Sequence, residues 1–176
     1  MIRPLLLPGV LAATMLAAPR DQARPPARDI PAGAVAEFCG MTLQQHPGPK
    51  AQLFAGDRVQ PYWFGSVREM FAFTMLPEEP KDIRAIYVTD LARARNWDFP
   101  EPGTWIEARA AVFVIGSRGD AHMDTDEAAP FGNAAAAAAF AARRGGRLVR
   151  FTGVPQEYIL GYSGAQPPVH AARSQR

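Results

Sequence analysis

Two stretches of this chain repeat one order of predicted elements, strand, strand, helix and strand, which leaves few folds open to it. The stretches are roughly 50–89 and 105–151, although residue identity between them is faint. A chain of 176 residues has room for one domain or for two very small units packed together. We therefore predict an α+β fold of two packed ββαβ units, which an internal duplication would produce.

Local signals position the elements of the first stretch. Ser66 and Glu69 have the spacing of a capping box, in which the serine hydroxyl and the glutamate carboxylate each satisfy a free amide at a helix start. Pro77 ends that helix. Apolar and aromatic runs, separated by turn residues, predict strands at 38–43, 50–54, 59–64 and 83–89.

The second stretch contains a long apolar run, an alanine-rich run and a short final strand. Residues 105–115 are predicted as a strand, and the continuously apolar part, 112–115, is typical of a central strand. Alanine has the highest helix propensity, so 134–144 is predicted as a helix with Asn133 as its N-cap. Two glycines end this helix, and 147–151 is the last predicted strand.

The two ends of the chain differ in composition from the middle. In residues 1–18, Arg3 is followed by an apolar run, and this pattern predicts an export signal. The run is shorter than the roughly 20 apolar residues that span a bilayer and is broken by prolines, which argues against a transmembrane helix. Residues 19–34 are predicted as a flexible linker, 35–162 as the folded domain and 163–176 as a disordered tail.

Composition and charge exclude one class of partner. Hydrophobic residues make up 48% of the chain, which is enough for a packed core. The formal charge of +2 owes much to arginines in the flanking segments, and no basic stripe interleaved with aromatic residues occurs inside the predicted domain. We therefore expect no binding of nucleic acid.

The single cysteine stands in the sequence Cys39-Gly40-Met41. On an extended strand, residues two apart point to the same face, so the two sulfur atoms would converge. A thiolate and a thioether form a soft donor pair, which selects copper(I). The alternative is a buried apolar pair, since free cysteine often behaves as a small hydrophobe. A zinc site needs three or four Cys, His or carboxylate ligands, and one cysteine with three histidines supports it poorly.

A polar loop at 120–127 supplies further candidate ligands. Met123 has no evident role in the core and is predicted as a third soft ligand. His122 is either a fourth ligand or a ligand of a second, harder ion, and a solvated loop without metal is the alternative for this segment. For His46, which lies in a turn followed by proline and glycine, a structural role is at least as well supported as ligation.

These motifs resemble those of the NosL family. The resemblance covers the whole predicted domain in order and is carried by Cys39-Gly40-Met41, 46–53, 66–71, 87–90, Trp97-Asp98, 103–106 and Pro130-Phe131. NosL proteins are copper chaperones that help assemble the copper–sulfide centre of nitrous oxide reductase. The resemblance implies a fold of two related ββαβ units, similar to that of the organomercurial lyase MerB.

The resemblance also implies a set of ligands. Cys39 and Met41 match the family's cysteine–glycine–methionine motif, and Met123 matches the methionine ahead of the proline–phenylalanine step. His122 matches a less fixed position. Family members are commonly lipoproteins whose lipid-bearing cysteine follows the signal. Pro19 stands at that place here, which leaves a freely soluble protein or one held by an uncleaved signal as the alternatives.

Three functions are open at this point. The first is a periplasmic copper(I) chaperone, with nitrous oxide reductase and its assembly proteins as partners. The second is a structural partner of the same machinery in which the sulfurs bind no metal. The third, an enzyme such as a MerB-like lyase, is disfavoured because that chemistry relies on more than one cysteine. Motifs such as a GxSxG elbow or a phosphate loop are also missing from the sequence.

Overall fold

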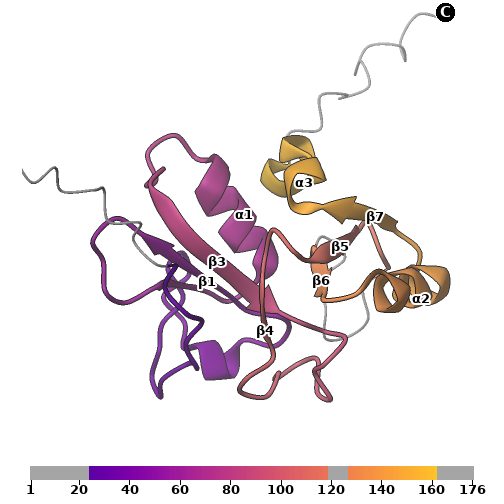
Figure 1. Cartoon of the computed structure of the whole chain (residues 1–176), viewed down its shortest axis with the longest axis horizontal. Coiled ribbons are helices and arrows are strands. Elements are labelled where there is room, and N and C mark those ends of the chain that lie inside the picture. The colour runs from indigo at the N-terminus through magenta and orange to yellow at the C-terminus, as the bar shows by residue number, and fades with distance from the viewer. Residues whose placement is uncertain (1–23, 119–126, 162–176) are drawn as a thin grey trace, which may run out of the picture.

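The computed structural model describes residues 24–118 and 127–161, and their strands and helices form two units of like topology (Figure 1). The first sheet has the strand order β2-β1-β3-β4 and the second β6-β5-β7, with antiparallel pairing throughout. The predicted α+β fold of two ββαβ units is confirmed. In chain order the elements are η1 (Leu43–Gln45), β1 (Ala51–Ala55), β2 (Tyr62–Phe64), α1 (Val67–Met75), β3 (Ile83–Thr89), β4 (Trp105–Glu107), β5 (Val112–Ile115), β6 (Ala129–Phe131), α2 (Ala134–Arg144), β7 (Arg147–Arg150), η2 (Phe151–Gly153) and α3 (Gln156–Leu160).

The first unit is built around β1, all of whose residues are buried between β2 and β3. Helix α1 begins at the predicted capping box. The Glu69 N–H donates to the Ser66 hydroxyl at 3.1 Å, and the Ser66 N–H donates to the Glu69 carboxylate at 3.4 Å. The strand predicted at 83–89 is confirmed as β3. The strand predicted at 59–64 is shorter, because only its last part forms β2.

The strand predicted at 105–115 is instead two strands that belong to different sheets. Strand β4 pairs with β3 at the edge of the first sheet, whereas β5 is the central strand of the second. The chain turns between them through backbone bonds from Ala110 to Glu107 at 3.0 Å and from Ala111 to Ala108 at 3.2 Å. The second ββαβ unit therefore starts at β5, and its second strand is β6, which the sequence did not predict.

Strand β5 is buried on both faces, as its apolar sequence predicts. Phe113 and Ile115 lie in the core shared with α1, whereas Val112 and Val114 pack with Phe140 of α2. The predicted helix 134–144 is confirmed, and its N-cap side chain accepts a hydrogen bond from the backbone N–H of residue 136 at 2.7 Å. The second sheet thus lies between α1 and α2 (Figure 1).

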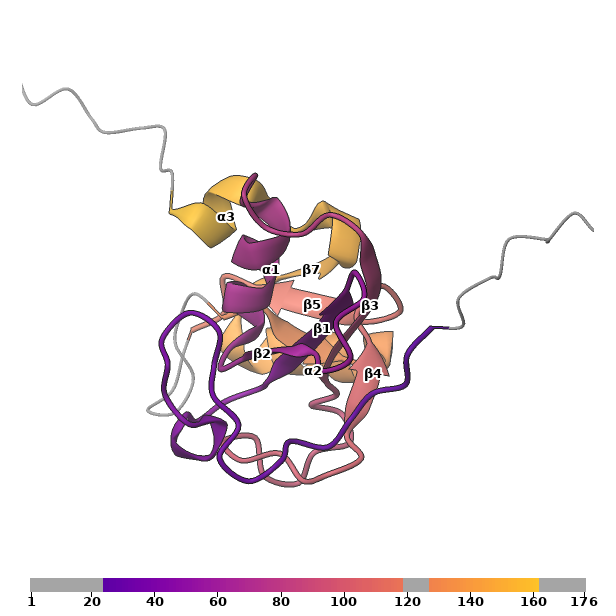
Figure 2. The ribbon, with the colours of Figure 1, turned by 90° about the vertical axis from the view of Figure 1, so that its left-hand side faces the viewer.

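The two units share one core through α1. The ring of Phe71 lies 5.1 Å from that of Phe113 and 5.0 Å from that of Phe151, between ring centroids. Helix α3 lies beside α1 (Figure 2), and Arg68 donates from Nε to the carbonyl of Ile159 at 2.9 Å. Because both units pack against α1, the first turn of this helix is held in position.

Residues 24–34 pack on the first sheet, which corrects the prediction of a flexible linker for this part of the chain. The backbone N–H of Arg28 donates to the Gln52 side chain, and that side chain donates back to the Arg28 carbonyl, both at 2.8 Å. The Tyr87 hydroxyl donates to the carbonyl of Pro25 at 2.6 Å. The folded body therefore starts upstream of residue 35. The predicted signal and tail lie outside the described residues. Within the described ranges, no helix has the length and apolar character to cross a membrane.

Candidate metal centre

The single cysteine lies at the tip of a tight turn, and the strand predicted at 38–43 is wrong. The Ala36 N–H donates to the Met41 carbonyl at 2.9 Å, and the Gly40 N–H donates to the Ala36 carbonyl at 3.0 Å. Gly40 has a φ of 68°, a left-handed conformation that side chains other than glycine rarely adopt. Cys39 and Met41 therefore flank a glycine in a turn and do not share a strand face, and both are exposed.

The base of this turn is anchored on both sides. Ala36 is buried with Leu43 and Trp63, and the Glu37 N–H donates to the Trp63 carbonyl at 2.8 Å. On the other side, the ring of Phe38 packs on two rings of the main core, those of Phe64 at 6.2 Å and Phe73 at 6.1 Å. These contacts on both sides hold Cys39, at the exposed tip of the turn, in position on the first unit.

Three potential metal ligands meet at this tip. The Cys39 sulfur, a ring nitrogen of His46 and a carboxylate oxygen of Glu69 all lie within 4.8 Å of one another. They come from three separate elements, namely the turn, the residue that follows η1 and the first turn of α1. An ion bound between them would be reached by a thiolate and an imidazole, which together suit copper or zinc.

The ring of His46 is held against the backbone at Gly65. A Cβ atom at Gly65 would lie 3.0 Å from the Cδ2 atom of His46, so the ring occupies space that only glycine leaves open. Nδ1 of His46 lies 3.3 Å from the Pro47 carbonyl. The tautomer that donates Nδ1–H to this carbonyl keeps the lone pair of Nε2 available for a metal.

The Glu69 carboxylate is fixed by the helix cap that the sequence predicts. Its Oε2 accepts hydrogen bonds from the backbone N–H groups of Gly65 at 3.0 Å and Ser66 at 3.4 Å. No pattern in the sequence connects this carboxylate with Cys39. The connection arises because the cap of α1 and the turn lie at the same end of the first unit.

Two buried ionisable side chains lie near this end of α1. Burial lowers the pKa of Lys50 to about 8, against the opposing pull of the carboxylates of Glu127, Asp98 and Glu69. Its ammonium donates to the Gly48 carbonyl. Burial raises the pKa of Glu127 to about 7, although hydrogen bonds from the backbone of Ala128 and Arg68 and the charge of Lys50 act in the other direction. Close to neutral pH, Glu127 is therefore divided between its charged and neutral forms.

The family model of NosL matches residues 26–159 of this chain. The chain belongs to the NosL family. A relative from Achromobacter cycloclastes, named copper-binding lipoprotein NosL, is 36% identical over 134 residues, which are 76% of this chain and 69% of the relative. A relative of the same name from Stutzerimonas stutzeri is 33% identical over 121 residues, which are 69% of this chain and 62% of the relative.

A solved structure in the NosL family has the same fold. The crystal structure of the copper chaperone NosL from Shewanella denitrificans superposes with a TM-score of 0.66 and 32% sequence identity. The match covers 75% of this chain and 98% of that one. The fold of two ββαβ units that the NosL resemblance implies is therefore found in this chain, while the implied similarity to MerB stays a prediction.

Two of the ligands predicted from the NosL resemblance, His122 and Met123, lie outside the described residues. The described chain resumes at Glu127, whose carboxylate accepts a hydrogen bond from the Arg68 N–H at 3.1 Å. Arg68 is the neighbour of Glu69 in the first turn of α1. Glu127, the first described residue after the predicted ligands, is therefore held at the first turn of α1.

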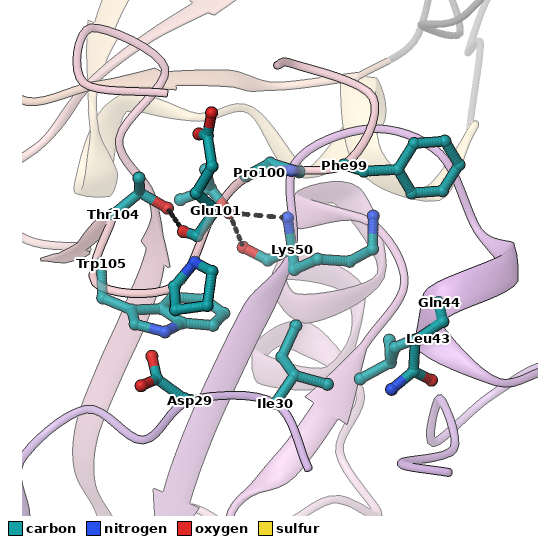
Figure 3. Close-up of a pocket in the computed structure, with 12 residues that line it drawn as sticks. Asp29, Ile30, Leu43, Gln44, Lys50, Phe99, Pro100, Glu101, Thr104 and Trp105 are labelled. Carbon is teal, nitrogen blue, oxygen red and sulfur yellow. Dashed lines mark hydrogen bonds between the residues drawn. The ribbon is translucent and has the colours of Figure 1, made fainter. Parts of the chain in front are cut away.

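A cavity of about 220 Å³ is lined by other residues of the chain (Figure 3). It opens between η1, the start of β1 and the segment that leads into β4, and Leu43, Trp105 and Lys50 are among the residues that line it. Cys39, His46 and Glu69 are not among its lining residues. In this member of the NosL family, the cavity is therefore not part of the candidate metal centre.

Proposed function

We propose that this protein is a copper(I) chaperone that is exported to the periplasm and delivers copper for the copper–sulfide centre of nitrous oxide reductase. The observation that carries the proposal is the meeting of the Cys39 sulfur with a His46 nitrogen, within 4.8 Å, at an exposed and anchored turn. The names of the relatives, copper-binding lipoprotein and copper chaperone, support copper as the metal.

Cys39, Met41 and Met123 are the proposed sulfur ligands, and His46 is the nitrogen ligand that the fold adds to them. A thiolate balances the single charge of copper(I), and thioether and imidazole donors add coordination without further charge. Glu69 is a hard donor whose Oε2 already accepts two backbone N–H groups. We assign it to the wall of the site, where it fixes the backbone beneath His46. His122 is proposed as a further ligand.

Covalent geometry makes Met123 an admissible ligand. Met123 stands four positions before Glu127, so its Cα cannot be more than about 14 Å from the Glu127 Cα even in a fully extended chain. Glu127 is itself bonded to the first turn of α1. A methionine that enters from this side would complete a sulfur-rich site with Cys39 and Met41.

The exposure of the proposed sulfur ligands suits delivery of the ion rather than permanent storage. Met41 is 47% exposed and Cys39 lies open to solvent, so the ligands of an acceptor protein can reach the ion. Copper then moves by stepwise ligand exchange, which needs no catalytic group in this chain, and we propose no enzymatic activity. The competing function, a structural partner with buried sulfurs, is disfavoured by the same exposure.

We propose the predicted signal at 1–18 as the route of export. The relatives are named lipoproteins, whereas this chain carries Pro19 where a lipid-bearing cysteine would follow the signal. We therefore propose that the protein is located in the periplasm. The partition of the full chain between the soluble and membrane fractions measures whether it is attached to the membrane.

The delivery role is tested in cells that produce nitrous oxide reductase. Replacing the chromosomal copy with Cys39→Ser should lower the copper content and the activity of the purified reductase. Leu148→Ala is a matched control, because Leu148 is an exposed apolar residue of β7 in the other unit. Full copper content of the reductase from the Cys39→Ser cells would overturn the proposed delivery.

A further inference from the structure

Exposed apolar side chains gather around the candidate copper site. Val35 is 48% exposed, Phe38 43% and Met41 47%, and all three belong to the turn that carries Cys39. Val59, in the loop before β2, is 71% exposed. We call these four residues the apolar rim. Of the six large hydrophobic side chains exposed in the described part of the chain, the apolar rim contains four, so their exposure is concentrated in one region.

The apolar rim is connected across its two segments by an ion pair. Arg58 lies 3.9 Å from the carboxylate of Glu37, and this pair ties the loop that carries Val59 to the turn that carries Phe38. The guanidinium of Arg58 also lies over the ring of Tyr62, 4.0 Å from its centroid. Two segments that are distant in the sequence therefore present one surface beside Cys39.

Two charges at the edge of the apolar rim pair with each other. Glu37 and Arg58 lie 3.9 Å apart, so this pair adds no net charge to the rim, whereas the Glu69 carboxylate lies within 4.8 Å of the Cys39 sulfur. An exposed apolar surface beside a functional site is the usual mark of a protein contact. A lipid surface or a polyanion would instead be met by unpaired cations.

We propose that the apolar rim is the docking surface for the protein that accepts copper, and that this acceptor presents its own copper ligand on an apolar, uncharged face. The inference rests on the proposed function. Ligand exchange requires an acceptor atom within bonding distance of the ion, about 2.3 Å for a sulfur ligand. An acceptor that reaches the ion at Cys39 must therefore press against the residues on either side of it.

The turn that carries three of the four residues of the apolar rim is anchored, which favours binding of a partner. The Phe38 ring is supported underneath by Phe64 and Phe73, so it offers its outer face without a loss of side-chain freedom on binding. Because Glu37 and Arg58 are paired, these two residues add little long-range attraction for an acceptor.

The test compares removal of copper by a protein with removal by a small chelator. The copper-loaded full chain is mixed either with copper-free nitrous oxide reductase or with bathocuproine disulfonate, which reaches the ion without covering the apolar rim. Val59→Glu should slow transfer to the reductase by about tenfold or more, since the new carboxylate is buried unpaired in the contact. Copper affinity and the rate of removal by the chelator should not change.

Leu148→Glu is the matched control, since Leu148 is 41% exposed on β7 in the second unit and lies outside the apolar rim. It should transfer copper at the wild-type rate. Val35→Glu is a second rim variant and should behave like Val59→Glu. If the wild-type protein loads the reductase and both rim variants load it equally fast, the docking proposal is wrong and the chaperone function stands. If the wild-type protein transfers no copper to the reductase, the reductase is not the protein that docks on the apolar rim, and direct delivery to it is overturned as well.

Discussion

The imidazole of His46 rests on Gly65, where a Cβ atom would come within 3.0 Å of the ring. This contact joins two features of the first unit. The backbone N–H of Gly65 donates to Glu69 in the cap of α1, and the same residue forms the floor under a proposed copper ligand. The position of the His46 ring therefore depends on the absence of a Cβ atom at Gly65.

Gly65→Ala should weaken copper(I) binding. The added methyl group would displace the His46 ring, and loss of support behind a metal ligand commonly lowers affinity by about tenfold or more. Competition against a chelator of known affinity measures the effect. Gly153→Ala is the control, because the nearest atom to a Cβ there lies at an ordinary 3.8 Å. Equal affinities of the two variants would show that the His46 ring does not contribute to binding.

Met41→Leu should lower copper affinity without affecting the fold. Leucine keeps the approximate volume of methionine and removes only the thioether donor. Because Met41 is 47% exposed, the free energy of unfolding should stay within about 0.5 kcal/mol of the wild-type value. Chelator competition and urea unfolding measure the two quantities. Wild-type affinity in this variant would remove Met41 from the ligand set.

Phe71→Ala should destabilise both units together. Phe71 is buried on α1 and its ring contacts those of Phe113 in the second unit and Phe151 in η2. Truncation of a buried phenylalanine costs about 3–5 kcal/mol of the free energy of unfolding. Urea unfolding should show a single transition at a lower midpoint. Phe99→Ala is the control, since Phe99 is 51% exposed. Two separate transitions in Phe71→Ala would contradict the shared core.

Glu127→Gln should flatten the dependence of stability on pH in the metal-free protein. Burial raises the pKa of Glu127 from 4.5 to about 7, so between these values the folded state holds a proton that the unfolded state has lost. The contribution of this group to stability is therefore highest below pH 4.5 and falls as the pH rises to 7, by about 3 kcal/mol at most.

Glutamine stays neutral over this range and keeps an oxygen for the backbone donors of Arg68 and Ala128, so that decline should disappear. Urea unfolding at several pH values checks it. Glu78→Gln, at an exposed position after α1, should keep the wild-type slope. An unchanged slope in Glu127→Gln would mean that Glu127 titrates normally in the folded protein.

The sequence predicted those elements whose signals are local. The capping box of Ser66 and Glu69, the N-cap of Asn133 and the apolar run of β5 each act within a few residues, and each is found where it was predicted. The division of 105–115 was missed because no glycine or proline marks it, and only tertiary pairing assigns the two parts to different sheets.

The candidate site was less predictable. The apolar residues of 38–43 predict a strand, yet Ala36 is buried with Leu43 and Trp63 while the Phe38 ring packs on the ring of Phe64, and the chain turns at Gly40. The approach of His46 and Glu69 to Cys39 follows from the folding of β1, β2 and α1 into one unit, and no local pattern encodes it. The predicted ligands His122 and Met123 lie outside the described residues and stay predictions.

If the Cys39 sulfur is a ligand of the copper(I) ion that the protein delivers, removal of this sulfur should abolish tight binding. Titration of the metal-free protein with copper(I) against a competing chelator, under conditions that exclude oxygen, measures the binding. We expect about one tightly bound ion per chain in the wild-type protein and loss of that tight binding in Cys39→Ala. A Cys39→Ala protein that binds copper(I) as tightly as the wild-type protein would show that this sulfur does not hold the ion.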